Sequence, residues 1–153
     1  FQREEHTLPM KLVAARFPKT LAETKAMARE LNPLCDVLFV PTMQGTQDDN
    51  GNPLSDKQVV PVLAGAFAKP VVGDHKYIIR YGMLCGMAQH IQEQGSTAAE
   101  MLLKAMRGTP VSEIPITRNR LGKPIINVTV MKALGIRPKP ILLKDTALVE
   151  TEP

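Results

Sequence analysis

Short apolar runs alternate along this chain with polar stretches rich in proline and glycine. Residues 10–15 form the first such run and predict a strand. Residues 21–31 place leucine, methionine and alanine at helical spacing behind Thr20, a good N-cap, and predict a helix. Residues 36–41 are a continuous apolar run that ends at a proline, which is typical of a strand buried on both faces.

The middle of the chain predicts a long loop followed by a helix. Residues 42–53 are rich in Asp, Asn and Gly, so we expect an unusually long loop there. Ser55 can cap a helix that continues to about Phe67, and Pro61 predicts a first-turn boundary or a kink within it. Three short elements follow: a strand at 70–72, a helix at 74–81 and a strand at 83–87.

The last third of the chain predicts one long helix and a return. The helix spans residues 92–107 and is ended by Gly108. Two extended pieces then flank a turn at residues 118–122, at 114–117 and 123–126. A closing helix occupies residues 128–134, with Gly135 just beyond its end.

This alternation of strands and helices predicts an α/β fold with an open, mostly parallel, doubly wound sheet. The predicted order of elements starts in an unusual way for such a fold, because residues 1–6 look like the tail of a helix with no strand before it. In a flavodoxin-like order the first strand lies centrally, between the second and the third. We therefore expect the chain to be a fragment whose missing strand comes from an upstream segment or another chain.

Composition narrows the class of protein. The chain has 153 residues, enough for one core, and its 44% hydrophobic content is typical of a globular protein. Its net charge of +4 is dispersed and its aromatic residues are few, so we do not expect nucleic-acid binding. Cys35 and Cys85 both lie in apolar surroundings and predict two buried thiols, although a disulfide between them stays possible. Neither they nor His6 and His90 have metal-ligand spacing, so we expect no metal and no cofactor.

Candidate binding residues follow from the rule that open α/β sheets bind ligands at the carboxyl ends of their strands. Three strand ends supply them: Thr42, Met43 and Gln44, then Asp74 and His75, then Ala88 and Gln89. The neighbouring Asp and His are a weak catalytic signal, because adjacent residues do not orient each other as a catalytic pair must. The sequence has no nucleophile elbow and no phosphate-binding loop, so we predict a binding protein rather than an enzyme.

Residues 36–150 resemble the C-terminal part of the ABC-transporter periplasmic substrate-binding proteins, a family that includes aromatic amino-acid binders. The resemblance is carried by five blocks: residues 36–41, 69–73, 81–86, 95–101 with Arg107 and Gly108, and 126–135 with 140–143. The last block is the most specific, because Asn127, the Leu134-Gly135 pair and a proline-rich exit form a recurrent ending of that family.

The resemblance implies one lobe of a type I periplasmic-binding-protein (Venus-flytrap) fold with a crossover to the second lobe. Residues 1–108 would form the C-terminal lobe, and residues 109–153 a return segment to the N-terminal lobe and a C-terminal tail. A small-molecule ligand would bind between this lobe and the missing N-terminal lobe. The protein would be periplasmic or extracellular, with or without a membrane anchor, and would deliver its ligand to the permease of an ABC transporter.

One departure concerns the ligand. Residues 87–94 lack the Asp with which the family meets an amino group, which argues against an ordinary α-amino acid.

An alternative is the extracellular ligand-sensing domain of a membrane signalling protein, a histidine kinase or a cyclase. A third possibility, an intracellular flavodoxin-type enzyme domain, would require a cofactor.

Overall fold

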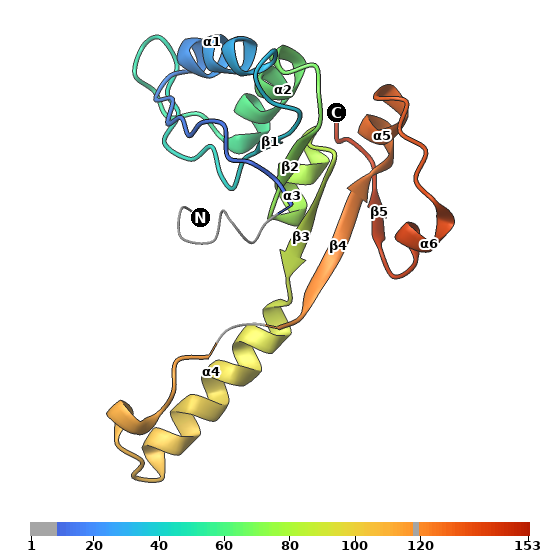
Figure 1. Ribbon diagram of the computed structural model, residues 1–153. Helices are drawn as coiled ribbons and strands as arrows, with labels where there is room; N and C mark the ends of the chain where they lie inside the picture. Colours follow the sequence, from blue (N-terminus) through green and yellow to red (C-terminus); the bar gives the residue numbers. More distant parts are fainter. Residues whose placement is uncertain (1–8, 118–119) are drawn as a thin grey trace.

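The computed structural model describes residues 9–117 and 120–153 (Figure 1). The helices are α1 (Leu21–Leu31), α2 (Asp56–Ala66), α3 (Lys76–Arg80), α4 (Ile91–Met106), α5 (Val128–Ala133) and α6 (Pro140–Leu143). The strands are β1 (Leu38–Phe39), β2 (Val71–Gly73), β3 (Cys85–Gln89), β4 (Gly122–Asn127) and β5 (Ala147–Val149). The helix tail predicted for residues 1–6 lies outside the described residues.

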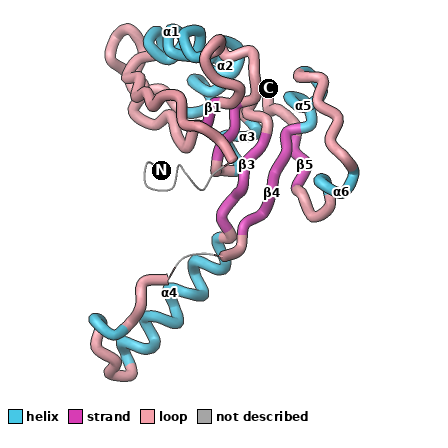
Figure 2. The backbone as a smooth tube through the Cα atoms, in the orientation of Figure 1, coloured by secondary structure: helices cyan, strands magenta, loops and turns pink. Residues whose placement is uncertain are grey.

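The strands form one sheet of five in the order β1-β2-β3-β4-β5 (Figure 2). β1, β2 and β3 run parallel, β4 is antiparallel to β3, and β5 is parallel to β4. Helices α1 and α2 lie together at the β1 end of the sheet, and α5 and α6 lie at the β5 end (Figure 1). This mixed, mostly parallel sheet with flanking helices confirms the predicted α/β class.

Local sequence signals explain where the helices begin. Thr20 caps α1 through its side chain, and Glu23 completes the capping box by accepting from the backbone of Thr20. At the start of α2, Oε1 of Gln58 accepts hydrogen bonds from both the backbone N–H and the hydroxyl of Ser55. Pro61 lies inside α2 without ending it. Pro61 is the sixth residue of that helix, where a backbone N–H would normally donate a hydrogen bond to the carbonyl oxygen one turn earlier. Proline has no N–H, so α2 lacks that hydrogen bond.

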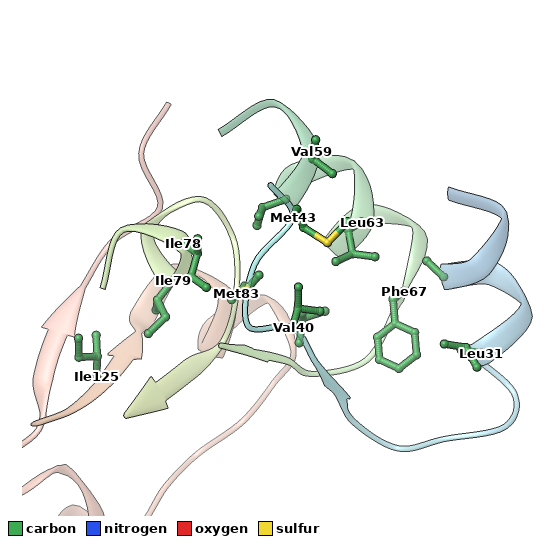
Figure 3. Packing of buried hydrophobic residues seen from close by; sticks show 13 residues of the cluster. Leu31, Val40, Met43, Val59, Leu63, Phe67, Ile78, Ile79, Met83 and Ile125 are labelled. Carbon is green, nitrogen blue, oxygen red and sulfur yellow. The ribbon is translucent and has the colours of Figure 1, made fainter. Parts of the chain in front are cut away.

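The hydrophobic core lies around α2, α3 and the first strands (Figure 3). Leu63 and Phe67 come from α2 and its end, Ile78 from α3, Met83 from the turn before β3, and Ile125 from β4. Each of these side chains is at most 2% exposed. This packing fixes the edge of the sheet at which β1, β2 and β3 end.

Two sequence predictions at the start of the chain are wrong. Residues 10–15 form no strand, and Met10 is 64% exposed, because no described strand lies beside them to pair with. The run at residues 36–41 does contain β1, but Phe39 is 49% exposed because β1 is the edge strand. The missing strand expected from an upstream segment or another chain stays a prediction.

The return also differs from its prediction. Residues 114–117 form no strand, and β4 pairs with β3 instead, with Cys85 opposite Ile126 and Gln89 opposite Gly122. Helix α4 and the residues that follow it therefore lie between two antiparallel neighbours in the sequence. Strand β5 and helix α6 were not predicted from the sequence. The closing helix is present as α5, and Gly135 beyond it has a positive φ of 68°. The division of the chain at residue 108 stays a prediction, but β4 and β5 lie in the same sheet as β1.

Helix α4 and residues 107–117 project from the sheet as an arm (Figure 1). None of the 16 residues of α4 is buried. One side of the helix is half covered by the segment that follows it, as where the Thr117 hydroxyl lies 3.8 Å from the sulfur of Met101. The other side exposes Leu102 and Met106, at 61% and 74%.

Candidate functional site

The carboxyl ends of β1, β2 and β3 meet at one edge of the sheet, because these strands are parallel neighbours. The antiparallel β4 begins at the same edge, opposite the end of β3. All the binding residues predicted from the sequence follow or end these strands. The structure divides them into two groups.

The first group surrounds Asp56, a buried residue in the first turn of α2 that the sequence analysis did not select. Its Oδ1 accepts a 3.0 Å hydrogen bond from the backbone N–H of Met43. Loss of hydration raises the pKa of the Tyr77 phenol of α3, and the nearby Asp56 carboxylate adds to that rise. Asp56 therefore joins the end of β1 to the start of α2 and lies close to the Tyr77 phenol.

Asp74 and His75 lie next to Tyr77 in this first group. The Oδ1 atom of Asp74 is 2.6 Å from Nδ1 of His75, so these sequence neighbours do pair. The imidazole ring lies 5.5 Å from the ring of Tyr77, measured between centroids. Both members of the pair are accessible, with side-chain exposures of 33% for Asp74 and 51% for His75. This end of β2 offers a carboxylate, an imidazole and a phenol to solvent.

The residues that follow β1 contribute fewer polar side chains to this edge than those that follow β2. The side chain of Met43 belongs to the hydrophobic core and is only 7% exposed. Thr42 and Gln44 are exposed, and the backbone N–H of Gln44 donates to Oγ1 of Thr42 at 3.1 Å. Of the predicted set, Met43 is thus the residue whose side chain does not reach the edge.

The second group lines a pocket at the end of β3, with a volume of about 460 Å³. Its lining consists of Met87, Ala88, Gln89, Gln94, Arg120, Leu121 and Gly122. Two of these, Ala88 and Gln89, were predicted from the sequence. Gln94 of α4 donates from Nε2 to Oε1 of Gln89 and so joins the end of the strand to the helix.

Glu93 holds the two sides of this pocket together. Its carboxylate accepts hydrogen bonds from the backbone N–H groups of Arg120 at 2.8 Å and Leu121 at 2.9 Å. These bonds lower the pKa of Glu93 below its ordinary value. His90 caps the same helix end, because its Nδ1 accepts from the backbone N–H of Glu93. The chain leaving the sheet is thereby tied to the chain returning to it.

The two groups lie at different heights along the edge. Gly73 ends β2 opposite Gly86, whereas β3 continues for three residues to Gln89. At roughly 3.3 Å per residue, the pocket lies roughly 10 Å beyond the Asp74 group. A solute in the pocket would lie between the sheet edge and the base of the arm.

Sequence reasoning missed Asp56, Tyr77, Glu93 and Arg120. Asp56 and Glu93 carry the only available signal, since both are acidic residues in the first turn of a helix. That signal is ordinarily explained by the helix dipole. Tyr77 and Arg120 have no local signal, because their importance depends on partners distant in the sequence.

The cysteines are free within the described part of the chain, and both are half-buried rather than fully buried. Burial raises the pKa of the Cys85 thiol. In residues 9–117 and 120–153, no group of three or more His, Cys, Asp or Glu side chains is arranged to hold a metal ion.

The chain is similar to known proteins at two levels. The family described as ABC transporter substrate binding protein matches residues 53–150. No curated protein matches the chain. The family match includes β2, β3 and the whole pocket lining, so it covers most of the site.

Solved structures share the fold at low identity. One is a ligand-free, open substrate-binding protein with adhesive properties from Clostridium difficile, with a TM-score of 0.70 and 22% identity over 99% of this chain. Another is an ABC domain from Streptococcus pneumonia in complex with L-Trp, with a TM-score of 0.61 and 18% identity over 85% of this chain. This chain spans 48% and 42% of those two proteins, about half of their length.

Proposed function

Because the chain belongs to the ABC transporter substrate-binding protein family, we propose that it binds a small solute and delivers it to an ABC transporter. The observation that carries this proposal is the pocket of about 460 Å³ at the end of β3. It lies at the sheet edge where open α/β domains bind their ligands. Asp74 and His75, which follow β2 at the same edge and roughly 10 Å from the pocket, add accessible polar groups.

The arm supports an inter-lobe position for the ligand. Leu102 and Met106 expose apolar surface along α4, and in the following segment Val111 is 77% and Ile116 is 96% exposed. A helix with one apolar side normally buries that side against a neighbour. We propose that a second, N-terminal lobe packs on the arm, so that the solute is enclosed between the two lobes. The half-length coverage of similar structures agrees with this arrangement.

The junction between sheet and arm has the form of a hinge. The chain leaves the sheet after Gln89 and returns at Gly122, and these two residues face each other across the β3–β4 ladder. Movements of domains about a ligand are usually absorbed by a few such residues at element ends. In this proposal the lobes close about the Gln89–Gly122 pair when the solute binds.

The proposed role places the protein in the periplasm or outside the cell, with a transporter permease as its partner and no reaction of its own. In the part of the chain that the structure describes, no helix is long and apolar enough to cross a membrane.

Mass spectrometry of the small molecules released when the purified protein is denatured tests the proposal. We expect one small molecule in stoichiometric amount, and it should raise the melting temperature when it is added back. A preparation that releases nothing, and that no compound in a broad metabolite library stabilises, would contradict a binding function.

A further inference from the structure

We propose that Arg120 recognises a carboxylate group on the solute, an inference that rests on the proposed binding function. Arg120 lines the pocket at the end of β3, where, among the lining residues that the structure describes, it alone has a charged side chain. The other polar side chains of the lining are the amides of Gln89 and Gln94. A cation beside two amides and three apolar side chains favours an anionic group attached to an apolar body.

The backbone of Arg120 is held in place before any ligand arrives. Its N–H donates to Oε1 of Glu93 at 2.8 Å, and the next N–H, from Leu121, donates to Oε2. The charged carboxylate makes these bonds stronger than those between neutral groups. Binding through the side chain therefore does not have to order this stretch of backbone as well, which removes one part of the entropic cost.

The guanidinium of Arg120 is free to meet a ligand. Among the residues that the structure describes, it makes no hydrogen bond and no ion pair within 4.0 Å. Its charge does act on Glu93, where it helps to lower the pKa. Both oxygens of that carboxylate are already engaged by backbone N–H groups, so the fork of the guanidinium stays available.

The rest of the lining defines the chemical class. The planar guanidinium fork matches a carboxylate in a two-bond arrangement. Met87 and Leu121 provide apolar surface, and both are more than half exposed without a ligand, at 56% and 58%. The amide oxygen of Gln89 is engaged by Gln94. We infer an organic monocarboxylate with an aliphatic or aromatic body, with no requirement for an ammonium group.

Paired probes test this inference. Thermal-shift measurements compare monocarboxylates with their primary amides, such as indole-3-propionate with indole-3-propionamide and hexanoate with hexanamide. The carboxylate that stabilises most is then titrated by calorimetry. We expect the carboxylate to bind and its amide not to bind. Arg120→Gln should weaken binding about tenfold or more, and Arg120→Lys should restore part of the loss.

The matched control is Arg107→Gln, because Arg107 is an exposed arginine at the far end of α4 and outside the pocket. It should bind as the unaltered protein does. Equal binding of acid and amide, or full affinity in Arg120→Gln, would overturn the inference. A released solute without an acidic group would also overturn it while leaving the binding function intact. If nothing is released and no compound binds, both proposals fail together.

Discussion

The carboxylate of Glu93 accepts a 2.8 Å hydrogen bond from the backbone N–H of Arg120, which lies 27 residues further along the chain. The bond joins the first turn of α4 to the segment that leads into β4. These are the two places where the chain passes between the sheet and the arm. The side chain of Glu93 thus holds the segment that leaves the sheet against the segment that returns to it, and it fixes the backbone of Arg120 at the pocket.

Because its backbone hydrogen bonds favour the ionised form, the pKa of Glu93 lies below its ordinary value of 4.5. The hydrogen bonds from Arg120 and Leu121 to the ionised Glu93 carboxylate therefore contribute fully above pH 4.5. Their contribution is lost as the pH falls through the lowered folded-state pKa. We expect hydrogen exchange at the amides of Arg120 and Leu121 to lose protection in that acidic range. Glu93→Gln should reduce protection at pH values above that range and remove the pH dependence. A pH profile identical in both proteins would contradict this assignment.

Gly86 permits the close approach of β2 and β3. A Cβ atom placed on it would lie 1.9 Å from the backbone oxygen of Gly73, which cannot move aside without breaking the strand pair. We expect Gly86→Ala to destabilise the fold by about 2 kcal/mol or more, as measured by urea unfolding.

Gly95 in α4 is the matched control for this prediction. A Cβ atom there meets nothing within 4 Å. Gly95→Ala should raise the helix content of the arm, because alanine favours a helix by about 1 kcal/mol over glycine. If Gly86→Ala proved as stable as Gly95→Ala, the β2–β3 geometry would be wrong.

Asn127 is fully buried and joins three parts of the lobe. Its Nδ2 donates to the backbone oxygen of Ile79 at 2.8 Å and to Thr151 at 2.9 Å. Its Oδ1 caps α5 by accepting from the N–H groups of Thr129 and Val130. Asn127→Ala leaves these buried groups unpaired, so we expect a loss of about 2–4 kcal/mol in urea unfolding.

A conservative variant separates the two roles of Asn127. Asn127→Asp keeps the acceptor that caps α5 but removes the donor to Ile79. It should therefore remain less stable than the unaltered protein. Full stability of Asn127→Ala would show that this network does not hold the lobe together.

The exposed side of α4 gives a prediction about the proposed second lobe. In this chain alone, Leu102→Glu with Met106→Glu should leave the melting temperature within about 2 °C, because both side chains are exposed. In a protein that contains both lobes, the same change should destabilise the pair and weaken solute binding. Lys104→Glu, an exposed change on the same helix, is the control. Unfolding of the single lobe by the double change would show that this side is covered within the chain.

The sequence predicted the elements whose signals are local. Helix α1 has its cap at Thr20 and its apolar spacing, and it spans the predicted residues 21–31. The strand at residues 10–15 was predicted from its apolar content, but a strand also needs a neighbour, which the sequence cannot show. For the same reason residues 123–126 could be predicted as extended, but not that their partner is β3, more than 30 residues earlier.

The sequence predicted the edge of the sheet at which the candidate site lies, but not which side chains contact one another there. The strand-end rule selected Ala88 and Gln89, and both line the pocket. It also selected Met43, whose side chain turns into the core. Arg120 could not be selected, because only the antiparallel pairing of β3 with β4 brings its segment to the end of β3.

The central claim is that a solute binds at the carboxyl edge formed by β2 and β3. Calorimetric titration of the released solute against Asp74→Ala, Gln89→Ala and the exposed control Gln92→Ala tests it most directly. We predict about tenfold weaker binding for Asp74→Ala and Gln89→Ala. The control should keep full affinity, and the melting temperature of each unliganded variant should change little. Unchanged affinity in both Asp74→Ala and Gln89→Ala would contradict the account.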